Sequence, residues 1–120
     1  MNSFPKLAPT DTLLVALQII LFGSERTAFV IDEGQKLLGV ITEGDVLRAV
    51  RDGFTLQGKV SNVMHLNYFL TERVLTDFEL LEILAKHGIL AVPVVTENRK
   101  LINVQYTREA LARKLTDLNE

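Results

Sequence analysis

The chain contains the same pattern twice. AFVIDEGQKLLGV (28–40) aligns without a gap on VPVVTENRKLINV (92–104), and Lys36 falls on Lys100, 64 residues later. Each copy has the order helix, strand, strand, helix and is too short to bury both faces of its own sheet. The repeat therefore predicts an α+β fold with two copies related by a pseudo-twofold axis and packed through their sheets.

Apolar periodicity and turn residues place the elements within each copy. Leu13–Phe22 is a run of ten mostly apolar residues before Gly23, which predicts a buried helix that Thr10 or Asp11 caps. Gly34 offers a positive φ for the turn between the first two strands. The expected helices and strands of both copies are 13–22, 27–32, 37–41, 42–53, 76–88, 89–96, 101–105 and 107–118. We expect one module over 1–120, with repeat one at about 7–53, a linker at about 54–60 and repeat two at about 61–118.

Composition excludes several classes of function. The 120 residues are 48% hydrophobic, carry a formal net charge of −2 and include no cysteine. Disulfides and sulfur-ligated zinc are thereby excluded, and no basic surplus indicates nucleic acid. Leu13–Phe22 is too short to span a bilayer, and no signal peptide is recognisable, so we expect no membrane partner and a cytoplasmic protein.

Chemistry-bearing motifs are also scarce in the sequence. His65 and His87 have no neighbour at metal-ligand spacing and are expected at the surface, so we predict no metal site. No serine stands in a nucleophile elbow, and neither glycine-rich phosphate motif occurs. We therefore predict that the protein has no catalytic residues and is not an enzyme.

Thr42 and Asp45 stand where the second strand meets a new helix, in GVITEGDVLRAV (39–50). One interpretation is a helix cap, in which the threonine accepts from a first-turn N–H and the aspartate completes a capping box. A second interpretation uses the same geometry to bind a ligand. Free N–H groups at a helix start attract phosphate, and a carboxylate one turn later can accept from ribose hydroxyls. Both interpretations can hold at once.

The repeat, with AFVIDEGQKLLGVITEGD in the first copy and GILAVPVVTENRKLINV in the second, resembles a tandem pair of CBS (cystathionine-β-synthase) domains, also called a Bateman module. The resemblance runs from about Leu7 to Leu115. The segment TAFVIDEGQKLLGVITEGDVLRAVRDG (27–53) is most similar to CBS pairs attached to sugar-phosphate nucleotidyltransferases and isomerases. It implies a regulatory module that binds adenine nucleotides between its repeats, forms homodimers and is not itself a catalyst.

The resemblance also assigns site residues. Gly39, Thr42 and Asp45 match the family's Gly-x-x-Thr-x-x-Asp pattern, which holds phosphate and ribose. By the same analogy Ala28 and Phe29 lie beside the adenine base, and Lys6 and Leu7 belong to the lead-in segment that lines the cleft. Ala28 and Phe29 are alternatively plain core residues, and Lys6 an ordinary exposed lysine.

The second copy departs from this pattern. Asn103, Tyr106 and Glu109 stand at the positions of glycine, threonine and aspartate. Glu109 can still reach a ribose, but tyrosine changes the phosphate position and the loss of glycine restricts close backbone approach. Pro93 matches the family's usual proline on that strand, or is alternatively an edge-strand proline. We expect one competent site in the first copy and a weak one, with Tyr106, Glu109 and Pro93, in the second.

The resulting hypothesis is a regulatory CBS pair that senses an adenosine-containing nucleotide and signals to an effector protein. AMP, ADP, ATP and S-adenosylmethionine are the candidate ligands, and no cofactor is expected. The alternative is a pair that has lost its ligand and serves for dimerisation or protein interaction. The incomplete motif of the second copy favours this alternative, whereas Thr42 and Asp45 favour the sensor.

Overall fold

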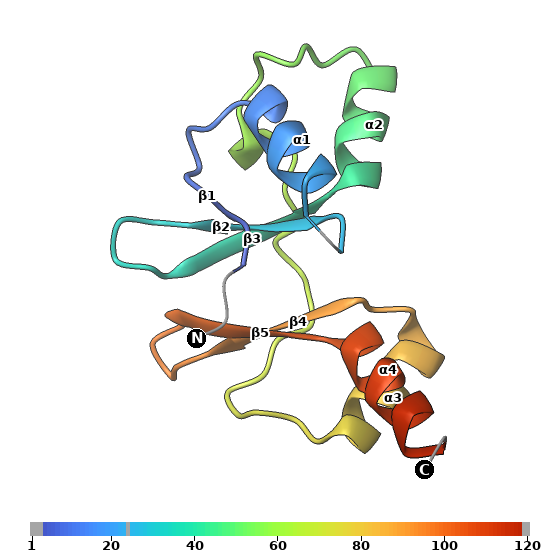
Figure 1. The fold of residues 1–120 in the computed structure, drawn as a ribbon. Helices are drawn as coiled ribbons and strands as arrows, with labels where there is room; N and C mark the ends of the chain where they lie inside the picture. The colour runs from blue at the N-terminus through green and yellow to red at the C-terminus, as the bar shows by residue number, and fades with distance from the viewer. Residues whose placement is uncertain (1–3, 24, 119–120) are drawn as a thin grey trace.

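The computed structural model describes residues 4–23 and 25–118. Four layers are stacked along an elongated molecule with extents of 49 × 31 × 24 Å. Two helices cover the outer face of one sheet, the inner faces of two sheets meet in the middle, and two further helices cover the other side (Figure 1). This arrangement confirms the predicted α+β fold with paired repeats.

The first repeat builds a three-stranded sheet in the order β1-β2-β3. Its elements are β1 (Lys6–Leu7), α1 (Leu13–Leu21), β2 (Thr27–Ile31), β3 (Leu37–Thr42) and α2 (Glu43–Arg51). The two helices and the sheet share a core in which Leu13, Ile20 and Val46 are fully buried. Gly53 follows α2 with a φ of 102°, a conformation that favours glycine and ends the helix as predicted.

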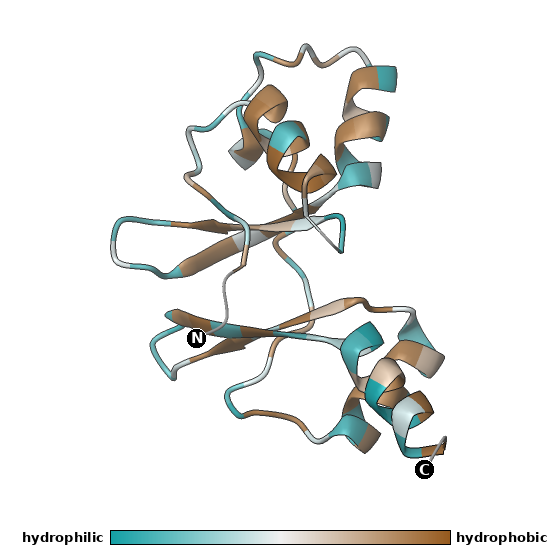
Figure 2. Ribbon diagram, viewed as in Figure 1, coloured by the Kyte–Doolittle hydropathy of each residue, from teal (hydrophilic) through white to brown (hydrophobic). Residues whose placement is uncertain are grey.

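The second repeat has the same order of helices and strands, but its helices are less apolar. After the short 3-10 helix η1 (Val60–Asn62) come α3 (Asp77–His87), β4 (Ala91–Val95), β5 (Leu101–Tyr106) and α4 (Thr107–Leu118). Thr76 caps α3 and Gly88 ends it in the left-handed conformation, both as the sequence predicts. Hydrophobic residues are denser in α1 than in α4 (Figure 2). The second helix layer accordingly encloses a smaller core of Leu75, Leu80, Val92 and Ala110.

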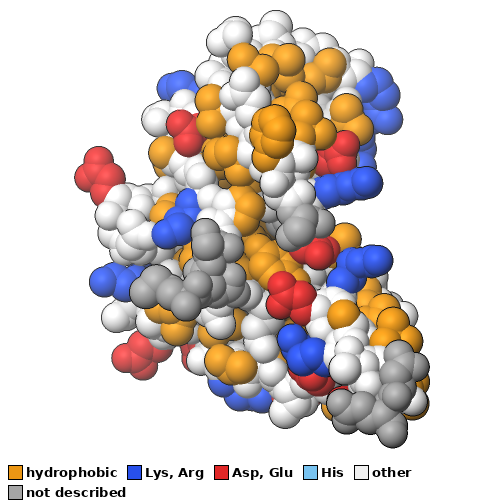
Figure 3. All heavy atoms as spheres, in the orientation of Figure 1, with side chains coloured by type: hydrophobic (Ala, Val, Ile, Leu, Met, Phe, Trp, Pro, Cys, Tyr) orange, Lys and Arg blue, Asp and Glu red, His pale blue; other side chains and the backbone are white. Residues whose placement is uncertain are grey.

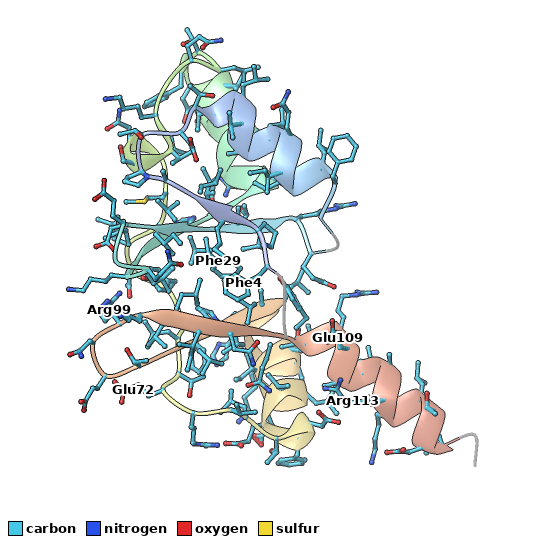
Figure 4. All side chains as sticks on the ribbon, turned by 60° about the vertical axis from the view of Figure 1, so that its left-hand side comes forward. Phe4, Phe29, Glu72, Arg99, Glu109 and Arg113 are labelled. Carbon is cyan, nitrogen blue, oxygen red and sulfur yellow. The ribbon has the colours of Figure 1, made fainter. Side chains whose placement is uncertain are left out.

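A core shared by the two repeats lies between the sheets. It contains Phe29 and Leu37 from the first repeat and Val95, Leu101, Val104 and Tyr106 from the second. Phe4 lies against Phe29 with ring centroids 6.2 Å apart and ring planes at 84° (Figure 4). Each repeat therefore completes the burial of the other's sheet, which explains why one copy would not suffice.

The two hairpin turns are also joined directly by their backbones. The N–H of Leu37 donates to the carbonyl of Arg99 at 2.9 Å, and the N–H of Leu101 donates to the carbonyl of Gln35 at 2.9 Å. Positions 35 and 37 of the first repeat correspond to 99 and 101 of the second, so each bond is the counterpart of the other. They fix the register of the first repeat on the second at the tips of the hairpins.

Three local details differ from the sequence prediction. The positive φ in each hairpin turn belongs to Gln35 and Arg99 rather than to Gly34. The cap of α1 is Thr12, because the carboxylate of Asp11 instead accepts from the N–H of Ala8. Strand β1 was not expected, since two residues carry no periodic signal; it pairs in parallel with β2.

Candidate functional site

The start of α2 carries the two residues that the sequence singles out. Thr42 ends β3 in an extended conformation, and its hydroxyl accepts from the N–H of Asp45 at 3.2 Å. The N–H and the hydroxyl of Thr42 both donate to Asp45 Oδ2, each at 2.8 Å. The capping box is thus complete, and the capping interpretation of this motif is confirmed.

The second carboxylate oxygen of Asp45 is occupied as well. Arg48 Nη2 donates to Oδ1 at 2.8 Å, and His65 Nε2 lies 2.6 Å from the same oxygen. Burial raises the pKa of Asp45, but hydrogen bonds from Thr42, His65 and Arg48 outweigh it and leave that pKa below its ordinary value. Asp45 is 6% exposed and ionised, and all its described donors come from this chain.

His65 is the functional neighbour that the sequence analysis missed. Its side chain is about half exposed, as expected for a surface histidine, yet it joins the segment between the repeats to α2 through Asp45. Its backbone also pairs with Val40 of β3, with N–H to carbonyl distances of 2.8 and 3.1 Å. A contact across 20 residues between a histidine and an aspartate leaves no spacing signal, so nothing in the sequence indicated it.

Gly39 of β3 lies where this strand meets the segment at Met64 and His65. A Cβ atom at Gly39 would stand 2.5 Å from Met64 Sδ and 3.0 Å from the carbonyl oxygen of His65. Glycine therefore allows the segment at Met64 and His65 to approach β3 closely. This packing role is independent of any ligand.

A cavity of about 440 Å³ lies between the repeats next to Thr42. Its wall combines the N-terminal end of α2 with the segment that leads into the second repeat and the start of β4. The residues that line it are Thr27, Val40, Thr42, His65, Asn67, Tyr68, Phe69, Gly88, Ile89, Leu90, Ala91 and Pro93. Thr42 and Pro93 thus share a cleft although they belong to different repeats, and His65 stands at its wall.

Four residues that we expected beside Thr42 lie elsewhere. Ala28 and Phe29 are fully buried, Ala28 in the core of the first repeat and Phe29 in the core between the sheets. Leu7 is buried on β1, and Lys6 is exposed with its ammonium 5.0 Å from the centre of the Phe4 ring. None of them lines the cavity at Thr42. β1 and β2 turn these side chains into the cores or onto another surface, so a role for them in binding stays a prediction.

Tyr106 and Glu109 lie at a separate cleft, at the start of α4. Its volume is about 630 Å³, and Phe4, Pro5, Glu25 and Thr27 of the first repeat line its other side. Pro93 is not part of this cleft, so the expected grouping of Pro93 with Tyr106 and Glu109 is corrected. The hydroxyl of Thr107 donates to the carbonyl oxygens of Ile89 and Leu90, at 2.8 and 3.3 Å, and does not cap the helix.

Within residues 4–23 and 25–118, no three histidine or carboxylate side chains are grouped so that they could hold a metal ion. In the same ranges, none of the helices has the length and apolar character needed to cross a membrane.

The fold, with two helix–strand–strand–helix repeats packed through their sheets, is that of solved tandem CBS pairs. Residues 1–52 match the family model described as "CBS domain". This match covers the first repeat, and solved structures extend the likeness to the whole chain.

Among those structures is an acetoin utilization protein (AcuB) from Vibrio cholerae, with a TM-score of 0.83 and 22% identity, covering 99% of this chain and 88% of that one. Another is the CBS domain protein PAE2072 from Pyrobaculum aerophilum in complex with AMP. Its TM-score is 0.73 at 21% identity, with 97% and 95% of the two chains covered.

A curated relative is inosine-5'-monophosphate dehydrogenase from Methanocaldococcus jannaschii, 28% identical over 108 residues. The aligned region is 90% of this chain and 21% of that enzyme. This chain therefore spans about a fifth of the relative's length.

Proposed function

We propose that the chain is a regulatory module that senses an adenosine-containing nucleotide in the cleft at Thr42 and signals to a partner protein. The observation that carries this proposal is the cavity of about 440 Å³ between the repeats. It places the hydroxyl of Thr42 and the N-terminus of a nine-residue helix beside apolar side chains from the other repeat. A phosphate fits the helix start, and a base fits the apolar wall.

The occupied carboxylate of Asp45 adds a condition to this proposal. Ribose hydroxyls can bond to Asp45 only if His65 or Arg48 gives up Oδ1. Both of these side chains are more than half exposed, so water can solvate them once they are displaced. Nucleotide binding would then release the segment between the repeats from α2, which supplies a route from ligand to conformation.

Several finer points belong to the proposal. AMP-bound PAE2072 supports an adenine nucleotide as the ligand class, with AMP, ADP, ATP and S-adenosylmethionine as candidates. The regulated enzyme is proposed to be a separate effector protein, of the sugar-phosphate type suggested by the sequence resemblance. The module itself is proposed to be non-catalytic and cytoplasmic, over residues 1–120 with its repeats at about 7–53 and 61–118.

The hydroxyl of Thr42 would have to turn from Asp45 Oδ2 to donate to phosphate, which valine cannot do. Thr42→Val should therefore weaken AMP about tenfold, whereas adenosine should bind nearly as before. Thr76→Val is the matched control, since Thr76 caps α3 in the same way but lines neither cleft. Both variants should lose about 1 kcal/mol of stability through the cap. Titration calorimetry with AMP and adenosine separates the two effects. Equal AMP affinities for the two variants would count against the proposed phosphate position.

A second candidate function is a ligand-free module for dimerisation or protein interaction. Two observations favour it: Asp45 is already satisfied within the chain, and the helices expose large apolar side chains. These are Leu21, Phe22, Leu47, Val50, Phe78, Leu111, Leu115 and Leu118. The absence of binding to all four candidate nucleotides, together with a stable complex, would favour this candidate over the sensor.

We expect a homodimer under either function, because association would cover these exposed helix residues. Light scattering coupled to chromatography should give twice the chain mass of 13.5 kDa. A mass of one chain at micromolar concentration would contradict this prediction.

A further inference from the structure

The second cleft differs from the first in its charge. It lies between the start of α4 and the first repeat. On the face shown in Figure 3, hydrophobic side chains fill the middle of the molecule, where the repeats meet, and charged side chains surround them. Glu25 and Glu109 both line it. The position of Glu25 corresponds in the repeat to Ile89, which lines the first cleft. The second cleft is therefore lined by two carboxylates, whereas none lines the first.

These two carboxylates differ from Asp45 in their surroundings, since Glu109 is exposed to solvent and Glu25 is only partly buried. Neither side chain makes a hydrogen bond or ion pair with any residue in the described ranges. Burial raises the pKa of Glu25; the charge of Arg108 lowers it in part, and the charge of Glu109 raises it further. Arg108 does not line the cleft. The cleft thus holds two like charges that repel each other, while Arg108 acts on Glu25 and Arg113 on Glu109.

Tyr106 provides a second, independent indication of a ligand. Its side chain lines the cleft, the residue is 8% exposed, and its phenol group has no hydrogen-bond partner among the described residues. Burial raises the pKa of Tyr106, and the charges of Glu109 and Glu25 raise it further, so the phenol stays neutral. No side-chain nitrogen or oxygen of the described residues is both buried and without a partner, so the phenol oxygen is open to the cleft, where water or a ligand can bond to it.

We propose that this second cleft binds a small organic cation with an apolar body and rejects phosphate. The two carboxylates would neutralise an ammonium-type charge, and the phenol oxygen would complete its polar surroundings. Phe4 and Ile19 form apolar wall for the body of the ligand. The ammonium of Lys6 already lies 5.0 Å from the centre of the Phe4 ring, so the carboxylates rather than this ring would hold the charge. Figure 4 shows Phe4 between the sheets and Glu109 at the start of α4.

Phosphate is disfavoured for two reasons. Both carboxylates repel it, and the hydroxyl at the start of α4 is occupied, since Thr107 donates to backbone carbonyls. The inference is independent of nucleotide binding at Thr42, because the two clefts share only Thr27 among their lining residues.

The test uses the full chain and benzyltrimethylammonium as the probe. Calorimetry and amide NMR shifts should show saturable binding, with the largest shifts near Tyr106 and Glu109. Benzyl alcohol and phenyl phosphate at equal ionic strength are the neutral and anionic comparisons and should bind much more weakly. Glu25→Gln and Glu109→Gln should each weaken the cation about five- to tenfold, because each removes one of the two charges.

Glu72→Gln is the matched control, since it makes the same charge change at a residue that lines neither cleft (Figure 4). It should leave the affinity for the cation unchanged, and melting curves should show that all variants fold. The proposal is overturned if the cation does not saturate, if the neutral or anionic probe binds as tightly, or if Glu72→Gln weakens binding as much as Glu109→Gln. Loss of AMP binding by Thr42→Val has no bearing on these outcomes.

Discussion

Phe29→Ala should lower the free energy of unfolding by about 3–5 kcal/mol, the usual cost of removing a buried phenylalanine from a core. Phe29 is fully buried between the two sheets and meets the ring of Phe4 edge to face. The cavity left behind would lie in the core that both repeats share, so their sheets should separate more readily. Urea denaturation with measurement of the midpoint and slope gives the change.

Phe54→Ala makes the same substitution at a ring that is 45% exposed and outside the three cores, and it should cost much less. If Phe29 instead lay beside an adenine base, its replacement would chiefly reduce nucleotide affinity. A stable Phe29→Ala protein that has lost AMP binding would therefore contradict the core position.

Asp45→Ala should cost about 2–3 kcal/mol, because it removes a buried capping carboxylate and leaves the partly buried N–H and hydroxyl of Thr42 without their acceptor. The effect should depend on pH. The folded pKa of Asp45 is lowered, so its stabilisation is fully present above its unfolded pKa of about 3.9 and is lost as the pH falls through the folded value. The stability difference between wild type and variant should therefore shrink below about pH 4.

Glu79→Ala is the matched control for Asp45→Ala, since Glu79 holds the same capping-box position in α3. The ion-paired hydrogen bond from Arg73, with further bonds from Thr76, lowers the pKa of Glu79 to about 2. This carboxylate lies at the surface, where water can replace its partners, so its removal should destabilise less at neutral pH. A larger loss for Glu79→Ala than for Asp45→Ala would contradict our account of the buried cluster.

The sequence predicted the fold well because each copy repeats signals that act locally. Thr42 and Thr76 cap helices, Gly53 and Gly88 end them, and β-branched residues mark the strands. The turn geometry was harder to predict. Side chains of Asp32 and Thr96 accept backbone N–H groups in the two turns, and the positive φ then falls on Gln35 and Arg99.

The candidate site was predicted only in part. The pairing of Thr42 with Asp45 follows from helix geometry, and it is present. The wall of the cleft depends on how the repeats face each other, which no local pattern encodes. For this reason Pro93 was assigned to the wrong cleft, and His65 was taken for an unengaged surface residue.

The backbone bonds between the hairpin turns, from Leu37 to Arg99 and from Leu101 to Gln35, have a consequence for how this chain can vary. Main-chain groups make both bonds, so substitutions in the turns should preserve them, apart from β-branched residues at positions 35 and 99, where φ is positive. A single inserted or deleted residue would shift one turn past the other and break both bonds together. The junction is therefore sensitive to loop length and largely insensitive to residue identity.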